Sequence, residues 1–178
     1  MPRLLLVRHA EAAVQASGGD RERPLTERGW ADAARLGIYL RESGLIPDAA
    51  LSSPARRAQD TLAAILQKMP LSRPFTSKVE SSLYCADAET ILALLPGPDQ
   101  PIETLLIVGH NPGIAEFARF LAGTDPGLPS QFPAPCLTVV DLSGRDWQEE
   151  AGRRLDRFVD FSVPQASQDS WQRGGSAC

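Results

Sequence analysis

The sequence lacks the features of a membrane protein, a secreted protein or a general nucleic-acid binder. No apolar run approaches the roughly 18 residues that a membrane-spanning helix needs. The apolar stretch near the N-terminus, Leu4–Val7, is shorter than the ~7–15 residues of a signal-peptide core. Lys and Arg total 18 against 22 Asp and Glu, so the formal net charge of −4 is not the basic excess typical of nucleic-acid binding. We therefore expect neither a membrane nor a nucleic acid as a partner.

Cysteine is also scarce. The three cysteines, Cys85, Cys136 and Cys178, are odd in number and widely spaced, and they form no C-x-x-C pair. They favour neither a disulfide framework nor a cysteine-based zinc site, and they are typical of a protein of the reducing cytoplasm. The 178 residues are 43% hydrophobic and 22% charged, which fits one globular domain. We place this domain at residues 1–161 and a polar, Gly/Ser-rich tail at residues 162–178.

Short apolar runs alternate with helical patterns along the chain. Strands are expected at residues 4–7, 49–51, near 79, at 105–108 and at 137–142, followed by a turn at Ser143-Gly144 and further strand pairing up to Phe161. The run Leu4–Val7 has no polar alternation, as in a strand covered by helices on both faces. This alternation predicts an α/β fold, a three-layer α/β/α sandwich whose central sheet is mostly parallel and flanked by helices.

The first predicted helix follows a polar loop. Thr26 is its expected N-cap, and the helix runs to about Ser43, where Gly44 stops it. Trp30 is predicted to lie on its apolar face, together with Ala33, Gly37 and Leu40.

Three further helices are expected. Ser53-Pro54 predicts a helix start, because proline at the first helical position gives up a donor that would have no partner there, and Pro70 ends this helix. Asp87 is expected to cap a helix through Leu95. Asn111-Pro112 predicts the start of the last helix, which has apolar residues at i, i+3, i+4 and i+7.

Basic side chains follow three of the predicted strands. Arg8-His9 comes directly after the first strand, Arg56-Arg57 lies early in the second helix, and His110-Asn111 follows the strand at 105–108. Each pair alone could be a surface feature. In open α/β sheets, however, ligands bind beyond the carboxyl ends of the strands, so these segments should converge on one pocket. Helix N-termini add N–H donors and partial positive charge there, and such a pocket favours a phosphate.

The chemistry of this pocket can be narrowed by exclusion. The sequence has no G-x-x-x-x-G-K-[ST] loop, no G-x-S-x-G elbow and no arginine six residues after Cys85 or Cys136, which argues against a P-loop, a hydrolase serine and a C-x5-R thiolate phosphatase. His9, Glu11 and His110 could bind a metal, but the adjacent arginines make this costly by charge repulsion. A neutral imidazole remains the best nucleophile for a covalent phosphoryl transfer.

Four short segments, in order between about residues 3 and 160, carry a family resemblance. They are Leu6-Val7-Arg8-His9-Ala10-Glu11, Arg23-Pro24-Leu25-Thr26-Glu27-Arg28-Gly29, Ser52-Ser53-Pro54 with Arg57, Ala58 and Thr61, and Val108-Gly109-His110-Asn111-Pro112-Gly113. They resemble the signature blocks of the histidine phosphatase superfamily. Ala10, where the family usually has glycine, resembles its bacterial phosphohistidine phosphatase (SixA-type) branch. The resemblance implies a phosphoglycerate mutase-like version of the predicted sandwich and selects Arg57 over Arg56.

The resemblance also implies residue roles. His9 would be the nucleophile that becomes phosphorylated. Arg8, Arg57 and His110, with Asn111 beside them, would bind the phosphoryl oxygens and neutralise charge in the transition state. Neither a metal nor another cofactor is required, because the arginines supply the positive charge.

The general acid that family members acting on phosphate esters usually carry has no clean counterpart here. Glu80 and Asp87 are the candidates, but Glu80 also fits a surface charge and Asp87 a helix cap. An imidazole leaving group needs less protonation than an alkoxide, so the sequence favours a phosphatase for phosphohistidine on a protein, such as a phosphotransfer or histidine-kinase-type domain. A phosphatase for a small phosphomonoester, such as a sugar or nucleotide phosphate, and a non-catalytic phosphate-binding module are the alternatives.

Overall fold

The computed structural model describes residues 2–70, 75–97, 100–123, 127–142, 147 and 153–161. The predicted tail at residues 162–178 and the predicted turn at Ser143-Gly144 lie outside these residues.

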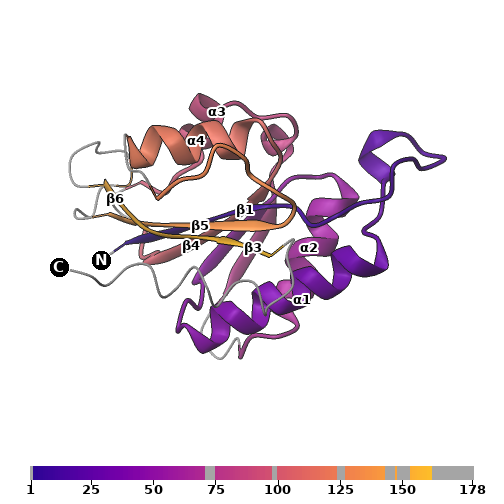
Figure 1. Ribbon diagram of the computed structural model, residues 1–178. Helices are drawn as coiled ribbons and strands as arrows, with labels where there is room; N and C mark the ends of the chain where they lie inside the picture. The colour runs from indigo at the N-terminus through magenta and orange to yellow at the C-terminus, as the bar shows by residue number, and fades with distance from the viewer. Residues whose placement is uncertain are drawn as a thin grey trace.

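Six strands form one mixed sheet (Figure 1). They are β1 (Arg3–Arg8), β2 (Ala49–Ser52), β3 (Thr76–Val79), β4 (Thr104–Gly109), β5 (Cys136–Leu142) and β6 (Arg153–Asp160). Their order is β3-β2-β4-β1-β5-β6, parallel from β3 to β1 and antiparallel for β5 and β6. The central pairs β4·β1 and β4·β2 join strands with unbroken runs of apolar residues, which require helices on both faces.

Helices cover both faces of this sheet. They are α1 (Glu27–Glu42) and α2 (Arg56–Leu66) on one face and α3 (Ala88–Ala93) and α4 (Gly113–Ala122) on the other (Figure 1). Alternate residues of β1 divide between the two cores, with Leu5 and Val7 packed toward α1 and α2 and Leu4 and Leu6 toward the other face. The predicted three-layer α/β/α sandwich with a mostly parallel sheet is therefore confirmed.

The predicted start of the second helix is wrong by two residues. Helix α2 begins at Arg56 rather than at Pro54, since the Ser53 hydroxyl accepts a hydrogen bond from the Ala55 N–H and Ala55 stays extended. The predicted start of the last helix at Asn111-Pro112 is confirmed, since α4 begins at Gly113 with Pro112 as its N-cap. Helices α2 and α3 also end earlier than predicted, at residues 66 and 93. The predicted caps Thr26 and Asp87 are confirmed.

The apolar face of α1 also differs from the prediction. Trp30 is exposed, and the buried face is Gly29, Asp32, Ala33, Leu36, Gly37 and Leu40. Gly37 belongs to this face because α1 and α2 approach closely there. A Cβ on Gly37 would lie 2.5 Å from the carbonyl oxygen of Ile65, so a larger side chain would separate the two helices.

Strands β1, β4 and β2 are neighbours, and their carboxyl ends meet at one edge of the sheet. Just past these ends, the His9 N–H donates to the carbonyl of Gly109 at 3.0 Å, and the Ser53 N–H donates to that of Val108 at 3.1 Å. The segment between β1 and α1 extends beyond this edge (Figure 1), held at its base by a bridge between Ala12 and Leu25. The chain segments that carry the predicted site residues therefore leave the sheet side by side, at the carboxyl ends of β1, β4 and β2.

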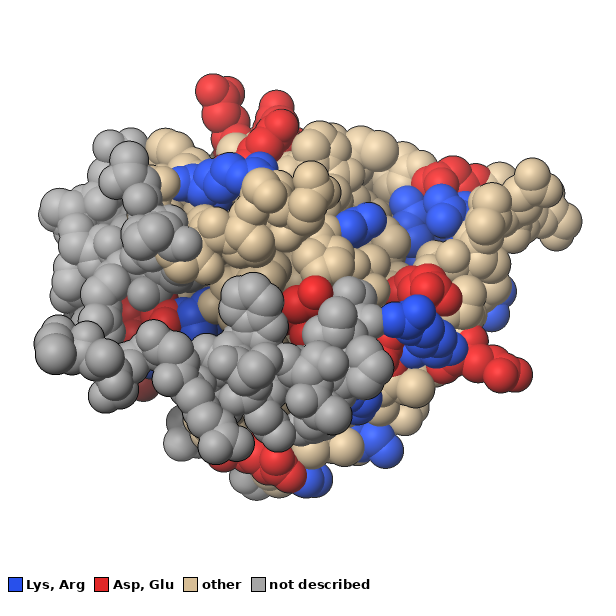
Figure 2. Space-filling view, in the orientation of Figure 1, with Lys and Arg blue, Asp and Glu red and all other residues tan. Residues whose placement is uncertain are grey.

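The lengths of the helices and the distribution of surface charge can be compared with the expectation of no membrane or nucleic-acid partner. None of the described helices has the length and apolarity needed to cross a bilayer. On the face drawn in Figure 2, basic and acidic side chains of the described residues are interspersed rather than gathered into a patch of one sign.

Candidate active site

His9 stands one residue beyond β1, and its hydrogen bonds define its tautomer. Its Nδ1 lies 2.7 Å from the carbonyl oxygen of Ala10, which can only accept, so Nδ1 carries the hydrogen. Its Nε2 accepts from the Nε of Arg57 at 3.2 Å and therefore carries a lone pair. Burial, together with the charges of His110, Arg57 and Arg8, lowers the pKa of His9 to about 3. At neutral pH His9 is an uncharged imidazole with Nε2 available as a nucleophile.

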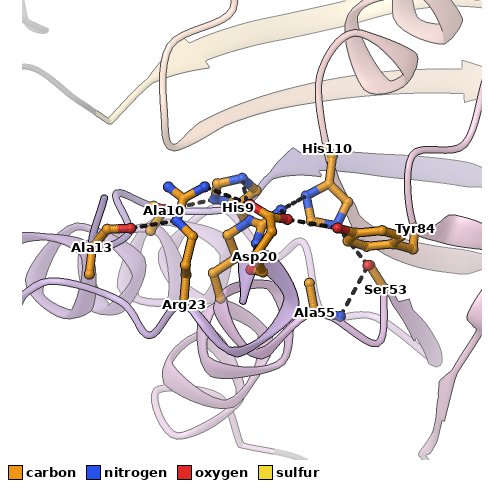
Figure 3. A network of polar contacts seen from close by, with 10 residues as sticks. His9, Ala10, Ala13, Asp20, Arg23, Ser53, Ala55, Tyr84 and His110 are labelled. Carbon is orange, nitrogen blue, oxygen red and sulfur yellow. Dashed lines mark hydrogen bonds and ion pairs between the residues drawn. The ribbon is translucent and has the colours of Figure 1, made fainter. Parts of the chain in front are cut away.

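His110 follows β4 and is held in the opposite tautomer. Its Nδ1 lies 3.4 Å from Nη2 of Arg57, which can only donate, so its Nε2 carries the hydrogen and donates to the Ser53 hydroxyl at 2.7 Å (Figure 3). Burial and the Arg57 charge lower its pKa to about 4. The His9 and His110 rings meet edge to face, with centroids 5.1 Å apart.

Arg57 lies in the first turn of α2 and contacts both histidines through one edge of its guanidinium. Its side chain is only 7% exposed. Arg56, its neighbour, points outward and pairs with Asp60. Of the two adjacent arginines, the structure therefore brings Arg57 to the histidines.

Arg8 and Asn111 flank the histidines on the α4 side of the sheet. The Nη1 of Arg8 and the Nδ2 of Asn111 both donate to the carbonyl oxygen of Phe132, the latter at 3.0 Å. The Nε of Arg8 is buried with no hydrogen-bond partner among the described groups. Burial lowers the pKa of Arg8, and its charge contributes to the lowered pKa of both histidines, which places it within electrostatic range of them.

Two hydroxyl groups fix the frame around these side chains. The Thr61 Oγ1 accepts from the Ala10 N–H at 3.0 Å and donates to the Arg57 carbonyl at 2.6 Å, which ties the turn after His9 to α2. The Ser53 Oγ bonds both His110 and the Ala55 N–H. Sequence patterns gave these two residues no role of their own, although both lie in the segment around Arg57 that carries the family resemblance.

The two predicted acid candidates are held in local structure. Glu80 caps a 3-10 turn (Ser81–Leu83) by accepting from the Ser82 N–H and hydroxyl, and it pairs with Lys78 at 2.8 Å. Asp87 caps α3 by accepting from the Thr90 N–H at 2.8 Å. These hydrogen bonds lower the pKa of each carboxyl, so both are ionised at neutral pH and neither bonds a histidine.

Glu11, the third side chain of the metal site that the sequence disfavours, has its partner outside the histidine pair. The Glu11 carboxylate accepts from the Thr26 hydroxyl at 2.8 Å, at the start of α1, rather than from a group of the histidine pair. Within the described ranges, no group of three or more His, Cys, Asp or Glu side chains is arranged to hold a metal ion.

Sequence reasoning missed Asp20 and Tyr84. Asp20 opens a 3-10 turn (Asp20–Glu22) in the segment between β1 and α1, and its Oδ2 accepts from Nη2 of Arg57 at 2.9 Å and from Oη of Tyr84 at 2.7 Å (Figure 3). The Tyr84 ring packs edge-on against His110, with centroids 5.7 Å apart. These two residues are 64 positions apart in loops, where no periodic pattern marks them.

Comparison with known proteins places this chain in a family. The model of the histidine phosphatase superfamily (branch 1) matches residues 4–77. An uncharacterised protein of Mycobacterium tuberculosis is 32% identical over 165 residues, covering 89% of this chain and 99% of its own. A protein of Agrobacterium tumefaciens assigned as the phosphohistidine phosphatase SixA is 30% identical, with a TM-score of 0.75 over 89% of this chain and 98% of its own. The chain belongs to the histidine phosphatase superfamily, in its SixA-type branch.

Membership of this superfamily implies phosphatase activity, but the fold alone does not select the substrate. A mycobacterial glucosyl-3-phosphoglycerate phosphatase shares the fold at 19% identity, with a TM-score of 0.57 over 88% of this chain and 97% of its own. The substrate class must therefore be argued from the site residues.

Proposed function

We propose that this protein hydrolyses phosphohistidine on a protein through a covalent phospho-His9 intermediate. The observation that carries the proposal is the state of the ionisable groups. His9 is a neutral nucleophile, whereas both candidate acids, Glu80 and Asp87, are ionised caps. The site is thus equipped for attack on phosphorus but not for protonating an alkoxide leaving group.

The reaction would proceed in two displacements. In the first, the lone pair on His9 Nε2 forms a bond to phosphorus while the bond from phosphorus to the substrate imidazole breaks, and the departing ring keeps that electron pair. A proton on the other nitrogen of the substrate ring makes it leave as neutral imidazole. In the second, a water oxygen forms a bond to phosphorus while the bond from phosphorus to His9 Nε2 breaks, and Nε2 keeps that electron pair. One proton of the water passes to solvent, and phosphate and neutral His9 are released.

Arg8 and Arg57 would stabilise the charge on the phosphoryl oxygens during both steps, and His110 would join them by taking up a proton on Nδ1, which carries a lone pair in the free site, as the phosphoryl group binds. Arg57 donates along the edge that faces the two histidines, and the buried Nε of Arg8 supplies a further donor. These donors are held in place before the substrate arrives, so little reorganisation is needed in the transition state. Asn111 would hold the Phe132 carbonyl near Arg8.

The test compares phosphate release from a phosphohistidine-bearing phosphotransfer domain with release from a panel of small phosphomonoesters. A general acid contributes about 10²–10⁴-fold, so we expect kcat/KM for the phosphohistidine to exceed that for the esters by about 10² or more. His9→Gln should abolish both turnover and the acid-labile phospho-enzyme. A preference for one small ester would instead establish the alternative phosphatase. Binding of the phosphorylated domain without turnover or phospho-His9 would establish a phosphate-binding module.

A further inference from the structure

Asp20 places a carboxylate against Arg57 in the candidate site. Besides the bonds from Arg57 and Tyr84 to its Oδ2, its Oδ1 accepts from Nη1 of Arg23 at 2.8 Å, and its main-chain carbonyl accepts from Nη1 of Arg57 at 2.6 Å. Arg21 lies 4.3 Å above the centre of the Tyr84 ring. One residue therefore joins the segment after β1, helix α2 and the loop before α3 (Figure 3).

These contacts divide the Arg57 guanidinium into two edges. The end-on edge, Nη1 and Nη2, bonds to Asp20, whereas the side edge, Nε and Nη2, bonds to Nε2 of His9 and Nδ1 of His110. The guanidinium is planar and its donors form a rigid fork, so fixing one edge fixes the direction of the other. The edge that Asp20 leaves free is the one that faces the nucleophile.

The charges fit the same interpretation. The side chain of Arg57 is 7% exposed and that of Asp20 is 48% exposed, so a buried cation is paired with a carboxylate that is about half exposed. Hydrogen bonds from Tyr84, Arg23 and Arg57 hold the pKa of Asp20 well below its usual range. A carboxyl group that stays ionised in this way does not donate a proton, so its contribution is positional.

We propose that Asp20 is the positioning residue of this site. Its hydrogen bonds to the end-on edge of Arg57 orient the guanidinium so that the side edge can donate to a phosphoryl group bound between His9 and His110. The inference rests on the proposed function, in which Arg57 binds the phosphoryl oxygens. The competing idea is that the Asp20 carboxylate occupies Arg57 in place of a phosphate. It makes the opposite prediction, because removing the carboxylate would then strengthen phosphate binding.

The experiment measures the affinity for inorganic phosphate by isothermal titration calorimetry, beside the rate of phospho-His9 formation. Asp20→Asn keeps the shape and removes the charge, and Glu22→Gln makes the same charge change two residues away on an exposed side chain. We expect Asp20→Asn to weaken phosphate binding about tenfold, the size of one lost charge-assisted hydrogen bond, and Glu22→Gln to leave it unchanged.

The double variant separates positioning from a general structural effect. In an Arg57→Ala background Asp20 has no guanidinium to orient, so adding Asp20→Asn should cause no further loss. Any of three results would overturn the proposal. They are equal phosphate affinity in Asp20→Asn and Glu22→Gln, tighter phosphate binding by Asp20→Asn than by the wild type, and a tenfold loss of phosphate affinity that persists in the Arg57→Ala background.

A second variant, Tyr84→Phe, and phospho-His9 formation by the wild type complete the test. Should Asp20→Asn fail to fold, Tyr84→Phe removes one bond to the same carboxylate, and a smaller loss of phosphate affinity that depends on Arg57 is expected. If Asp20→Asn lowers the phosphate affinity only when Arg57 is present, but the wild-type protein forms no phospho-His9, then the positioning role of Asp20 is upheld and the proposed phosphatase activity is refuted. If phospho-His9 forms normally but Asp20→Asn does not change phosphate binding, only the positioning role of Asp20 is refuted. If the wild-type protein binds no phosphate, both the positioning role and the proposed phosphatase activity are refuted.

Discussion

Mild acid should destabilise the protein through His9. Burial and the surrounding positive charge lower the pKa of His9 to about 3 in the folded protein, whereas an unfolded chain has a histidine pKa near ~6.5. Between these two values the unfolded chain binds a proton that the folded protein does not. The free energy of unfolding is therefore highest above about pH 6.5 and falls as the pH falls through this window.

The size of the effect follows from the shift. One proton costs about 1.4 kcal/mol per pH unit, so lowering the pH from 7 to 5 should remove about 2 kcal/mol through His9 alone. This is a large share of the ~5–15 kcal/mol that stabilises a typical domain. The lowered pKa of His110 acts in the same direction.

Urea denaturation at pH 7 and at pH 5 measures this loss, with His9→Gln as the comparison. The variant keeps the other titrating groups, so their contribution cancels in the difference between the two proteins. The wild type should lose about 2 kcal/mol more than His9→Gln on acidification. Equal losses in the two proteins would refute the assignment of His9 as a buried, neutral imidazole.

One close packing contact and one buried hydrogen bond around the site give further predictions. A Cβ on Gly113 would lie 1.8 Å from the carbonyl oxygen of Ala86, so Gly113→Ala should lower the free energy of unfolding by about 1–3 kcal/mol, measured in urea, whereas Gly97→Ala, with open space around it, should not. Thr61→Val leaves the buried N–H of Ala10 without its acceptor and should cost about 1–3 kcal/mol in the same assay and reduce the rate of phospho-His9 formation. Wild-type stability in either variant would contradict these contacts.

The architecture could be predicted from the sequence because its signals are local. Unbroken apolar runs mark β1 and β4, and the residues Thr26 and Asp87 cap helices as their types predict. The predictions failed where a tertiary contact decides. Trp30 matches the apolar period of α1, but the buried stripe is centred on Leu36 and Gly37, against α2. Pro54 fits a first helical position, but the Ser53 hydroxyl delays the helix.

Of the site residues, the sequence could predict those that stand directly after a strand. His9 and His110 each stand just past a strand end, and parallel pairing of β1 with β4 brings them together. Asp20 and Tyr84 lie in irregular segments, so their meeting depends on how two loops fold over the sheet edge. No residue pattern records such a contact.

The sheet order has a consequence for how the chain folds. Strand β4 lies between β1 and β2, so Leu106 pairs with Leu5 on one side and Ala50 on the other, although these strands are separated from it by more than fifty residues. A nascent chain that ends before β4 has no partner to join β1 to β2, and both strands keep exposed hydrogen-bonding edges. The candidate active site therefore cannot form on the ribosome until more than half of the chain has emerged, and this long-range pairing should make folding slow.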